Sequence, residues 1–229
     1  MVSRYAASPP APAAAPTSRD RLLRAAAEEF AARGFDGAKV DRIAARARVN
    51  KALLYYYFRS KAALYREVLR DLFGTIARAV AAARDETSPP EAQLERYIET
   101  LAGEIVRRPL FPALWLREMA EGGRHVDESI VAEMKRVLEQ LGAILQEGRR
   151  AGAFVDANPF VIQVGIVAPL LFFAATAPIR ERFRGSAPPA VSAIPREAVL
   201  EHVRAATLSV LGVGSGVRGA APRSRRHVR

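Results

Sequence analysis

The chain has no cysteine, a single tryptophan and three methionines in its 229 residues. The lack of cysteine excludes disulfide bonds and thiolate metal sites, and it is compatible with a reducing cytosol. The three histidines, His125, His202 and His227, lie far apart in the sequence. Since no cysteine accompanies them, we expect no metal site.

The strings that commonly accompany catalysis are also missing, among them the P-loop, G-x-S-x-G and H-E-x-x-H. Gly214, Gly216 and Gly219 match the G-x-G-x-x-G string of dinucleotide-binding folds. No strand is expected before this string, and only ten residues follow it, so a Rossmann unit cannot be built there. We therefore expect neither an enzyme nor a cofactor.

Helical periodicity is the dominant pattern, and no segment alternates as a strand does between turn signals. The sequence therefore predicts an all-α protein. We expect a disordered arm rich in Pro and Ala (1–17), a small DNA-binding domain (18–64), a larger helical domain (65–212) and a basic flexible tail (213–229). The predicted helices are 18–34, two short helices within 40–61, and 60–83, 91–107, 111–121, 127–150, 159–177 and 196–211.

The segment Phe160–Ala177 is free of charge and approaches the ~20 residues that a membrane span needs. Gln163 and Pro169 interrupt it, and Asn158 followed by Pro159 is typical of the start of a helix in a soluble protein. A helix that is apolar on all sides is more often buried between protein surfaces. We therefore expect no contact with a membrane.

The segment Val40–Lys61 carries two short apolar faces at helical spacing, separated by a break. Asn50 is a good N-cap for the second helix, and Ala44 is small enough for a close crossing of the two helices. This spacing predicts a helix-turn-helix, although it also fits a pair of amphipathic core helices. The apolar positions are Val40, Ile43, Ala44 and Ala47, then Val49, Leu53 and Leu54.

Basic and phenolic side chains gather in and just after the second of these helices. Residues 18–61 hold eleven basic and five acidic residues, and residues 213–229 hold five arginines and no acid, whereas residues 62–212 have a net charge of −1. A basic patch confined to one module is typical of nucleic-acid binding. The groups that can reach phosphates and base edges are Lys51, Tyr55, Tyr56, Tyr57, Arg59 and Lys61.

Residues 18–64 contain GFDGAKVDRIAARA, LYYYF and SKAAL in this order. In this the chain resembles the DNA-binding domain of the TetR family of bacterial transcriptional regulators. The resemblance implies that Lys51, Tyr55 and Tyr57 touch DNA and that Lys61 holds a phosphate. The full set of candidate DNA-binding residues is Lys39, Arg42, Arg48, Asn50, Lys51, Ala52, Tyr55, Tyr56, Tyr57 and Lys61.

This segment departs from the family pattern at three positions. Lys39 stands where Ser or Thr usually caps the second helix, and Ala52 stands where Gly often lets the backbone approach DNA. Arg48 stands where Gly usually makes the turn. We expect Arg48 to adopt a positive φ, at a cost of about 1 kcal/mol relative to Gly.

The family resemblance also implies the architecture of the remaining chain. Its last two long helices, here Phe160–Ala177 and Arg196–Leu211, would form a homodimer, and the preceding helices would enclose a small, mostly apolar effector. The same side chains also fit an ordinary core. The candidate pocket residues are Phe111, Leu114, Trp115, Met119, Phe172 and Phe173, with Arg117, Glu118 and His125 as polar partners.

These observations favour a cytoplasmic homodimeric repressor that binds double-stranded DNA at an inverted repeat and is released by a small molecule. One DNA-binding domain offers few phosphate contacts, whereas two such domains about 34 Å apart add their binding energies. The alternative is a structural DNA-binding protein without an effector.

Overall fold

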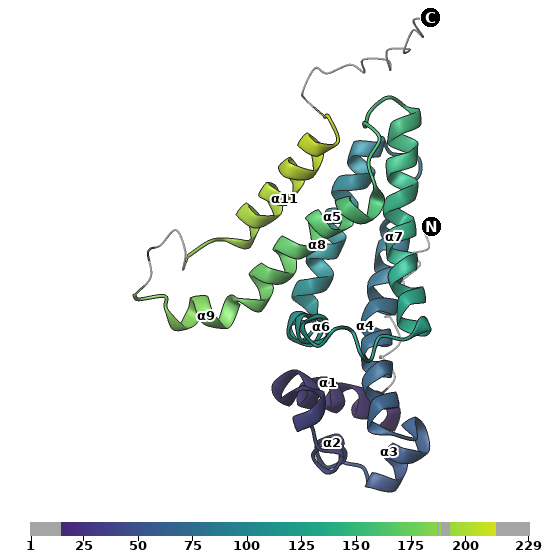
Figure 1. The fold of residues 1–229 in the computed structure, drawn as a ribbon, viewed down its shortest axis with the longest axis vertical. Helices are drawn as coiled ribbons and strands as arrows, with labels where there is room; N and C mark the ends of the chain where they lie inside the picture. The colour runs from purple at the N-terminus through teal and green to yellow at the C-terminus, as the bar shows by residue number, and fades with distance from the viewer. Residues whose placement is uncertain (1–14, 187, 189–192, 214–229) are drawn as a thin grey trace, which may run out of the picture.

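The computed structural model describes residues 15–186, 188 and 193–213, and these form helices and loops without a strand. Figure 1 shows a small N-terminal part, made of α1 (Ser18–Gly37), α2 (Val40–Ala47) and α3 (Lys51–Phe58), below a larger helical body. Helix α4 (Lys61–Ala83) runs from the N-terminal part into the body. The predicted all-α class is confirmed.

The body consists of α4 together with helices that come after it in the chain. Most of them start and end within a few residues of the predicted positions. One short helix, α9, directly succeeds the apolar helix and was not predicted. The bounds are α5 (Pro90–Arg107), α6 (Phe111–Ala120), α7 (Glu128–Arg150), α8 (Pro159–Ala175), α9 (Ala177–Arg182) and α11 (Arg196–Val210).

Side-chain caps fix several helix starts where the sequence places them. Asn50 Oδ1 accepts a hydrogen bond from Leu53 N at 2.7 Å, and Ser60 Oγ accepts one from Ala63 N at 3.0 Å. These bonds satisfy amide groups that a first helical turn leaves unpaired. The predicted cap at Asn50 is therefore confirmed, and the caps at Asn50 and Ser60 set where α3 and α4 begin.

Gly34 is the position at which the first helix was predicted to end. It adopts φ +70°, but helical hydrogen bonding continues beyond it to Gly37, so the residue makes a kink rather than the end of the helix. Glycine adopts this left-handed conformation without the strain that a Cβ would cause. The kink places Phe35 and Asp36 against the body.

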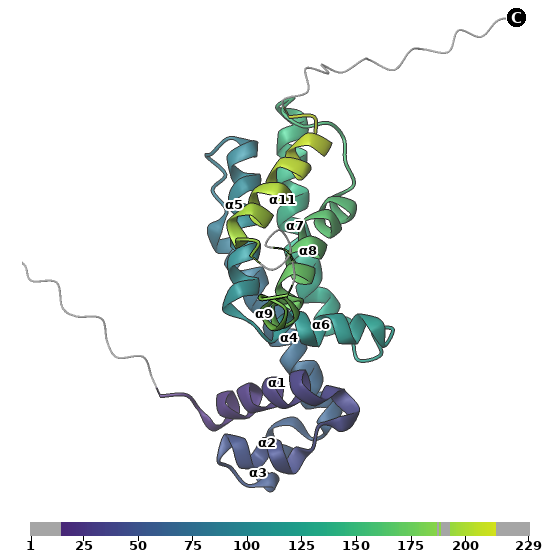
Figure 2. The same cartoon turned by 90° about the vertical axis from the view of Figure 1, so that its left-hand side faces the viewer.

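Helix α4 connects the two parts through a continuous buried face. Leu64 and Leu69 are buried toward the N-terminal part, and Ile76 and Val80 are buried further along the same helix. Helix α7 lies alongside α4 in both views (Figures 1 and 2). A motion of α4 in the body is therefore a motion at the base of the N-terminal part.

Helix α8 lies beside α11, at the edge of the body (Figures 1 and 2). The stretch Pro159–Arg182 is long and apolar enough to cross a membrane by length and composition, yet only 22% of its apolar window is buried within the chain. Phe160 is 61% exposed and Phe172 is 67% exposed. A single chain therefore leaves a large apolar face of α8 uncovered.

Candidate nucleic-acid interface

The turn between α2 and α3 contains a residue in the left-handed conformation. Arg48 has φ 55° and ψ 48°, as the sequence predicts for a residue that replaces a turn glycine. Its amide donates to the carbonyls of Ala44 and Ala45, which closes the end of α2. Lys39 starts α2 without a side-chain cap, so one of the usual stabilising bonds of this helix is missing.

Helices α2 and α3 pack on α1 through small and branched apolar side chains. Ile43 and Leu54 are fully buried, and Ala44 and Ala47 are nearly so. Phe58 ends α3 on the buried side. Because these positions hold α3 by one face, its other face is left to the solvent.

The exposed face of α3 is made of phenol rings and cations. Tyr56 is 78% exposed, and Tyr55 and Tyr57 flank it with about half that exposure. The rings of Tyr56 and Tyr57 meet edge to face at 5.4 Å between centroids. Ala52 is also exposed, near the start of the helix. This surface offers phenol donors and apolar ring faces, which suit base edges and thymine methyl groups in a major groove.

Lys51, the first residue of α3, is paired with Asp41 of α2 at 2.8 Å. The hydrogen bond from its ammonium group to Asp41, with the charge of that carboxylate, raises the pKa of Lys51. Both side chains are half-exposed or more, and ion pairs of this kind contribute little stability. A phosphate group can therefore replace Asp41 as the partner of Lys51 at a small cost in stability.

Lys61, the first residue of α4, reaches back to the end of α1. Its Nζ donates to the Asp36 carbonyl at 3.2 Å and lies 4.7 Å from the centroid of the Phe35 ring. This contact holds the ammonium group close to the α3–α4 turn. It also links a predicted phosphate contact to the segment of α1 that touches the body.

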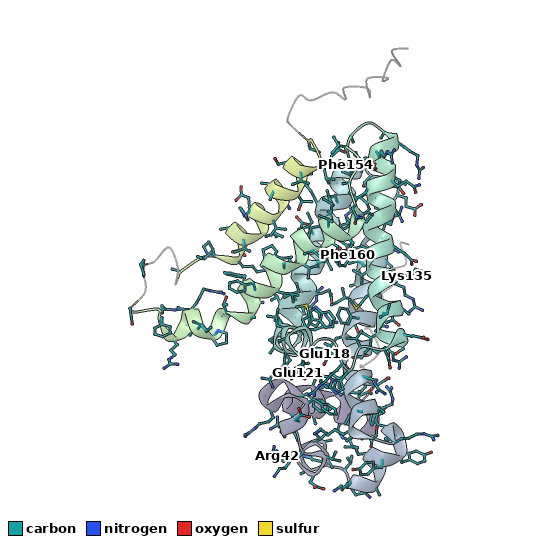
Figure 3. All side chains as sticks on the ribbon, viewed as in Figure 1. Arg42, Glu118, Glu121, Lys135, Phe154 and Phe160 are labelled. Carbon is teal, nitrogen blue, oxygen red and sulfur yellow. The ribbon has the colours of Figure 1, made fainter. Side chains whose placement is uncertain are left out.

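Arg42 has a structural partner within the N-terminal part. Its Nε donates to Glu29 Oε1 at 2.6 Å and its Nη2 to the Gly37 carbonyl at 3.0 Å. The Glu29 side chain is only 3% exposed, whereas that of Arg42 is 43% exposed. Figure 3 labels Arg42 in the N-terminal part. Burial opposes the charged form of Glu29, but the bonds from Arg42 and from the Lys39 amide outweigh it, and the pKa of Glu29 lies below its usual range.

All ten candidate DNA-binding residues thus lie in a short span from the start of α2 to the start of α4. Nine of them are exposed and Lys61 is partly buried. They differ in their bonding, because Arg42, Asn50, Lys51 and Lys61 already have partners within the chain. The structure therefore brings this set together on one part of the molecule.

The candidate effector residues are spread over three places. Phe111 and Trp115 pack edge to face on Phe73 of α4, at 5.4 and 4.8 Å between ring centroids, and Leu114 is buried in the same helix. Met119 and Phe172 are exposed, and Phe173 lies under the Arg180 guanidinium. Arg117, Glu118 and His125 turn instead toward the N-terminal part.

Glu118 and His125 form the junction between the body and the N-terminal part. Glu118 accepts bonds from the His125 amide at 2.7 Å and from its ring Nδ1 at 3.0 Å. The His125 ring lies 4.1 Å from that of Phe35 and 4.9 Å from that of Tyr65. Burial, the Glu118 charge and a hydrogen bond to Glu118 raise the pKa of Tyr65.

Charged residues continue this junction on its surface. Arg124 bonds Asp36 of α1 and Glu121 of its own loop, each at 2.8 Å. The Arg124 guanidinium keeps the pKa of Asp36 below its usual range. Arg117 lies across Gly34, where a Cβ would come within 2.5 Å of its Nη1. The kinked end of α1 is thus held by α6 and by the segment that joins α6 to α7.

Glu118, Glu121 and His125 also have the chemistry of metal ligands, with one ligand atom of each within 4.8 Å of the others. Figure 3 shows both glutamates at the boundary between the two parts. Their oxygens already accept bonds from His125 and Arg124. We interpret this cluster as a contact between the two parts.

Two family models match the chain over most of its described length. One describes bacterial regulatory proteins of the tetR family and matches residues 22–68, and the other describes a tetracyclin repressor-like C-terminal domain and matches residues 90–187. The chain belongs to the TetR family. It is therefore a DNA-binding helix-turn-helix regulator of transcription and not an enzyme.

Curated relatives and solved structures agree with this assignment. The chain is 30% identical to the transcriptional regulator RutR of Escherichia coli over 72% of its own length and 77% of that protein. It is 29% identical to the transcriptional repressor NicS of Pseudomonas putida over 68% of its length and 74% of that protein. A regulator from Streptomyces coelicolor, SCO4942, superimposes with a TM-score of 0.62 at 27% identity, covering 83% of this chain and 98% of that one.

Two arginines on successive turns of α2 provide a matched test of the N-terminal part of this TetR-family protein. Replacing Arg42 by Ala leaves the buried Glu29 carboxylate without its cation, and we expect a loss of roughly 3 kcal/mol in unfolding free energy. Arg46 pairs with Glu28, and both side chains are at least 40% exposed. Arg46→Ala should therefore change stability by less than about 1 kcal/mol in chemical denaturation.

The pH dependence of the unfolding free energy provides a second test of the Arg42–Glu29 pair. In the wild type the lowered pKa of Glu29 adds stability at neutral pH, and this stability is lost as the pH falls through the folded-state pKa, below the usual 4.5. In Arg42→Ala, Glu29 keeps the hydrogen bond from the Lys39 amide but loses the bond and the charge of Arg42. We expect burial then to outweigh the remaining interactions and raise the pKa of Glu29, so the stability deficit of the variant should shrink on acidification. A deficit that stays constant from pH 7 to about pH 4 would contradict this account of Arg42.

Proposed function

We propose that this TetR-family regulator is a cytoplasmic homodimeric repressor that occupies an inverted-repeat operator and is released by a small molecule. The observation that carries the proposal is the exposed phenol and ammonium surface of α3 on a helix-turn-helix. That NicS is named a repressor supports this choice. The same DNA-binding part without a ligand-responsive body would make a structural DNA-binding protein, which remains the alternative.

We assign residues 18–64 to DNA binding and residues 65–212 to effector binding and dimerisation. Most of the N-terminal arm (1–17), almost all of the basic tail (213–229) and the G-x-G-x-x-G string at Gly214–Gly219 lie outside the described residues. The proposal therefore rests on the helices from α1 to α11.

The uncovered face of α8 supports a homodimer. Phe160, Val161, Val164 and Phe172 are exposed on α8, and α11 packs beside this helix. Two copies that met through α8 and α11 would bury these side chains. This burial would stabilise the dimer by roughly 25 cal/mol for each Å² of apolar surface removed from water. A second copy of the chain covers such a face without any need for a membrane.

Phe172→Asp tests this interface. A carboxylate there would be buried unpaired between the two copies, so we expect the variant to sediment as a monomer at concentrations where the wild type is a dimer. Val131→Asp is the control, because Val131 is a similarly exposed apolar residue on α7, away from α8. If the wild-type protein were monomeric, or soluble only in detergent, the proposed dimer interface would be wrong.

The effector would act through α4. The candidate pocket side chains Phe111 and Trp115 pack on Phe73 of α4, and Arg117, Glu118 and His125 hold the end of α1. A ligand that binds one arrangement of these helices more tightly than another shifts the population of both arrangements. A change in the spacing of the two DNA-binding parts would then weaken simultaneous contact with two half-sites.

Selection from a random DNA library with the purified protein at physiological salt tests the function as a whole. We expect a palindrome to be enriched, with an affinity at least ~10³-fold higher than for unrelated DNA. Half-site centres about one helical turn apart, or a multiple of it, would match two DNA-binding parts on one face of the duplex. Binding without enrichment would favour the structural DNA-binding protein.

Lys61→Ala separates phosphate contacts from base contacts. Each phosphate contact adds about 0.9 to the slope of log affinity against log salt, so the loss of Lys61 from both copies should reduce that slope by roughly 2. The affinity for operator and unrelated DNA should fall together. Lys135→Ala is the control, because Lys135 is an exposed residue of α7 (Figure 3). An unchanged slope for Lys61→Ala would rule out the assigned phosphate contact.

A further inference from the structure

A small cavity lies between α4, α5 and α7, at the end of α4 that is remote from the DNA-binding part. The centre of a water molecule can occupy a volume of about 10 Å³ in this cavity, which is close to the minimum needed to hold one buried water. None of the residues proposed for the effector pocket lines it. Its lining consists of Val80, Ala83, Arg84, Gln93, Tyr97, Gln140 and Ile144.

Two lining residues carry buried polar atoms without a hydrogen-bond partner among the described residues, Arg84 Nε and Gln93 Oε1. Gln93 is only 4% exposed. Leaving such a group unsatisfied costs about 1–3 kcal/mol. One donor and one acceptor beside the same cavity therefore lack partners within the described chain.

Glu147 of α7 fixes the orientation of both side chains. One of its oxygens accepts a bond from Arg84 Nη2, and the other accepts one from Gln93 Nε2 at 3.1 Å. Gln93 Nε2 also donates to the Ser88 carbonyl at 2.9 Å. Since the amide nitrogen has two acceptors, a flipped amide is disfavoured, and Oε1 remains the free acceptor.

We propose that Arg84 and Gln93 form a small-molecule site, separate from the side chains assigned to the effector above, and that this site recognises a neutral amide group. The amide carbonyl accepts from Arg84 Nε, and the amide N–H donates to Gln93 Oε1. A carboxylate would suit Arg84 but would face the Gln93 oxygen and the Glu147 carboxylate. An ester or a tertiary amide has no donor for Gln93.

The position of the site suggests how such a ligand acts, and this step rests on the proposed function. Val80 and Ala83 belong to the last turns of α4, whereas Gln140 and Ile144 belong to α7. A molecule larger than water must move these two helices apart. The ligand would therefore displace the C-terminal end of α4. The other end of α4 begins at Lys61, beside the DNA-binding surface.

Thermal unfolding of the full chain with and without millimolar 2-pyrrolidone tests the recognition, with γ-butyrolactone, N-methyl-2-pyrrolidone and butyrate as matched probes. A ligand that binds only the folded protein raises the melting temperature. We expect 2-pyrrolidone to bind at least tenfold more tightly than each of the other three. No shift with 2-pyrrolidone, or equal shifts with the lactone or the tertiary amide, would overturn the proposal.

Two cavity variants and one control locate the binding. Gln93→Met removes the acceptor, and Arg84→Lys removes the Nε donor while keeping a cation for Glu147. Each should weaken 2-pyrrolidone binding at least tenfold. Arg204→Lys is the control, because Arg204 Nε is also buried without a hydrogen-bond partner among the described residues, but Arg204 lies on α11 outside the cavity lining. If both cavity variants bound 2-pyrrolidone as tightly as the wild type, or if Arg204→Lys lost as much affinity as they did, the proposed site would be wrong.

These measurements need no DNA, so they succeed or fail independently of the operator selection. Release of the selected operator by 2-pyrrolidone, lost in Gln93→Met, would support the regulatory role. Binding of 2-pyrrolidone at this site with no release of operator would overturn that role. Failure of the operator selection alone would contradict the proposed function and leave the amide site standing.

Discussion

The continuity of α4 is the constraint on which the rest of the structure depends. Its 23 residues span about 35 Å, from Lys61 beside the DNA-binding surface to Ala83 beside the cavity. One buried face of this helix belongs to both parts of the molecule. Packing along that face means that the body cannot rearrange around α4 without affecting the base of the helix-turn-helix.

The junction around Phe35 adds a second connection to the one that α4 provides. Lys61 and Arg124 both lie within 6 Å of the Phe35 ring centroid, and His125 packs against the same ring. Residues from α1, α4 and the α6–α7 segment therefore meet at one side chain. With two separate attachments, the orientation of the DNA-binding part relative to the body is defined, which a dimer reading two half-sites requires.

Local signals in the sequence predicted the features that depend on neighbouring residues. The caps at Asn50 and Ser60 and the left-handed turn at Arg48 could be predicted because each depends on a few adjacent backbone groups. The kink at Gly34 was predicted only as a helix end, because the course of the chain after Gly34 depends on Arg117, a distant residue that packs across it. The candidate DNA-binding residues also lie within one short segment, so their proximity follows from the local sequence.

Features that join distant segments could not be predicted in this way. Glu29 and Arg42 belong to different helices, and Arg84 and Gln93 meet through Glu147 from a third. A signal for the second cluster was present, because Gln93 is a polar residue one turn before Tyr97 on the apolar face of α5. Only the packing of α5 on α4 and α7 shows that its amide oxygen is left without a partner in the described chain.

In the proposed dimer, the body holds the two DNA-binding parts at a defined separation. The chain has no cysteine, so Arg46→Cys provides a single site for a spin label in each copy, and pulsed dipolar spectroscopy measures the distance between the two labels. We predict one narrow distance distribution for the free protein, little changed when the selected operator binds. A broad distribution, or no dipolar coupling at all, would contradict the claim.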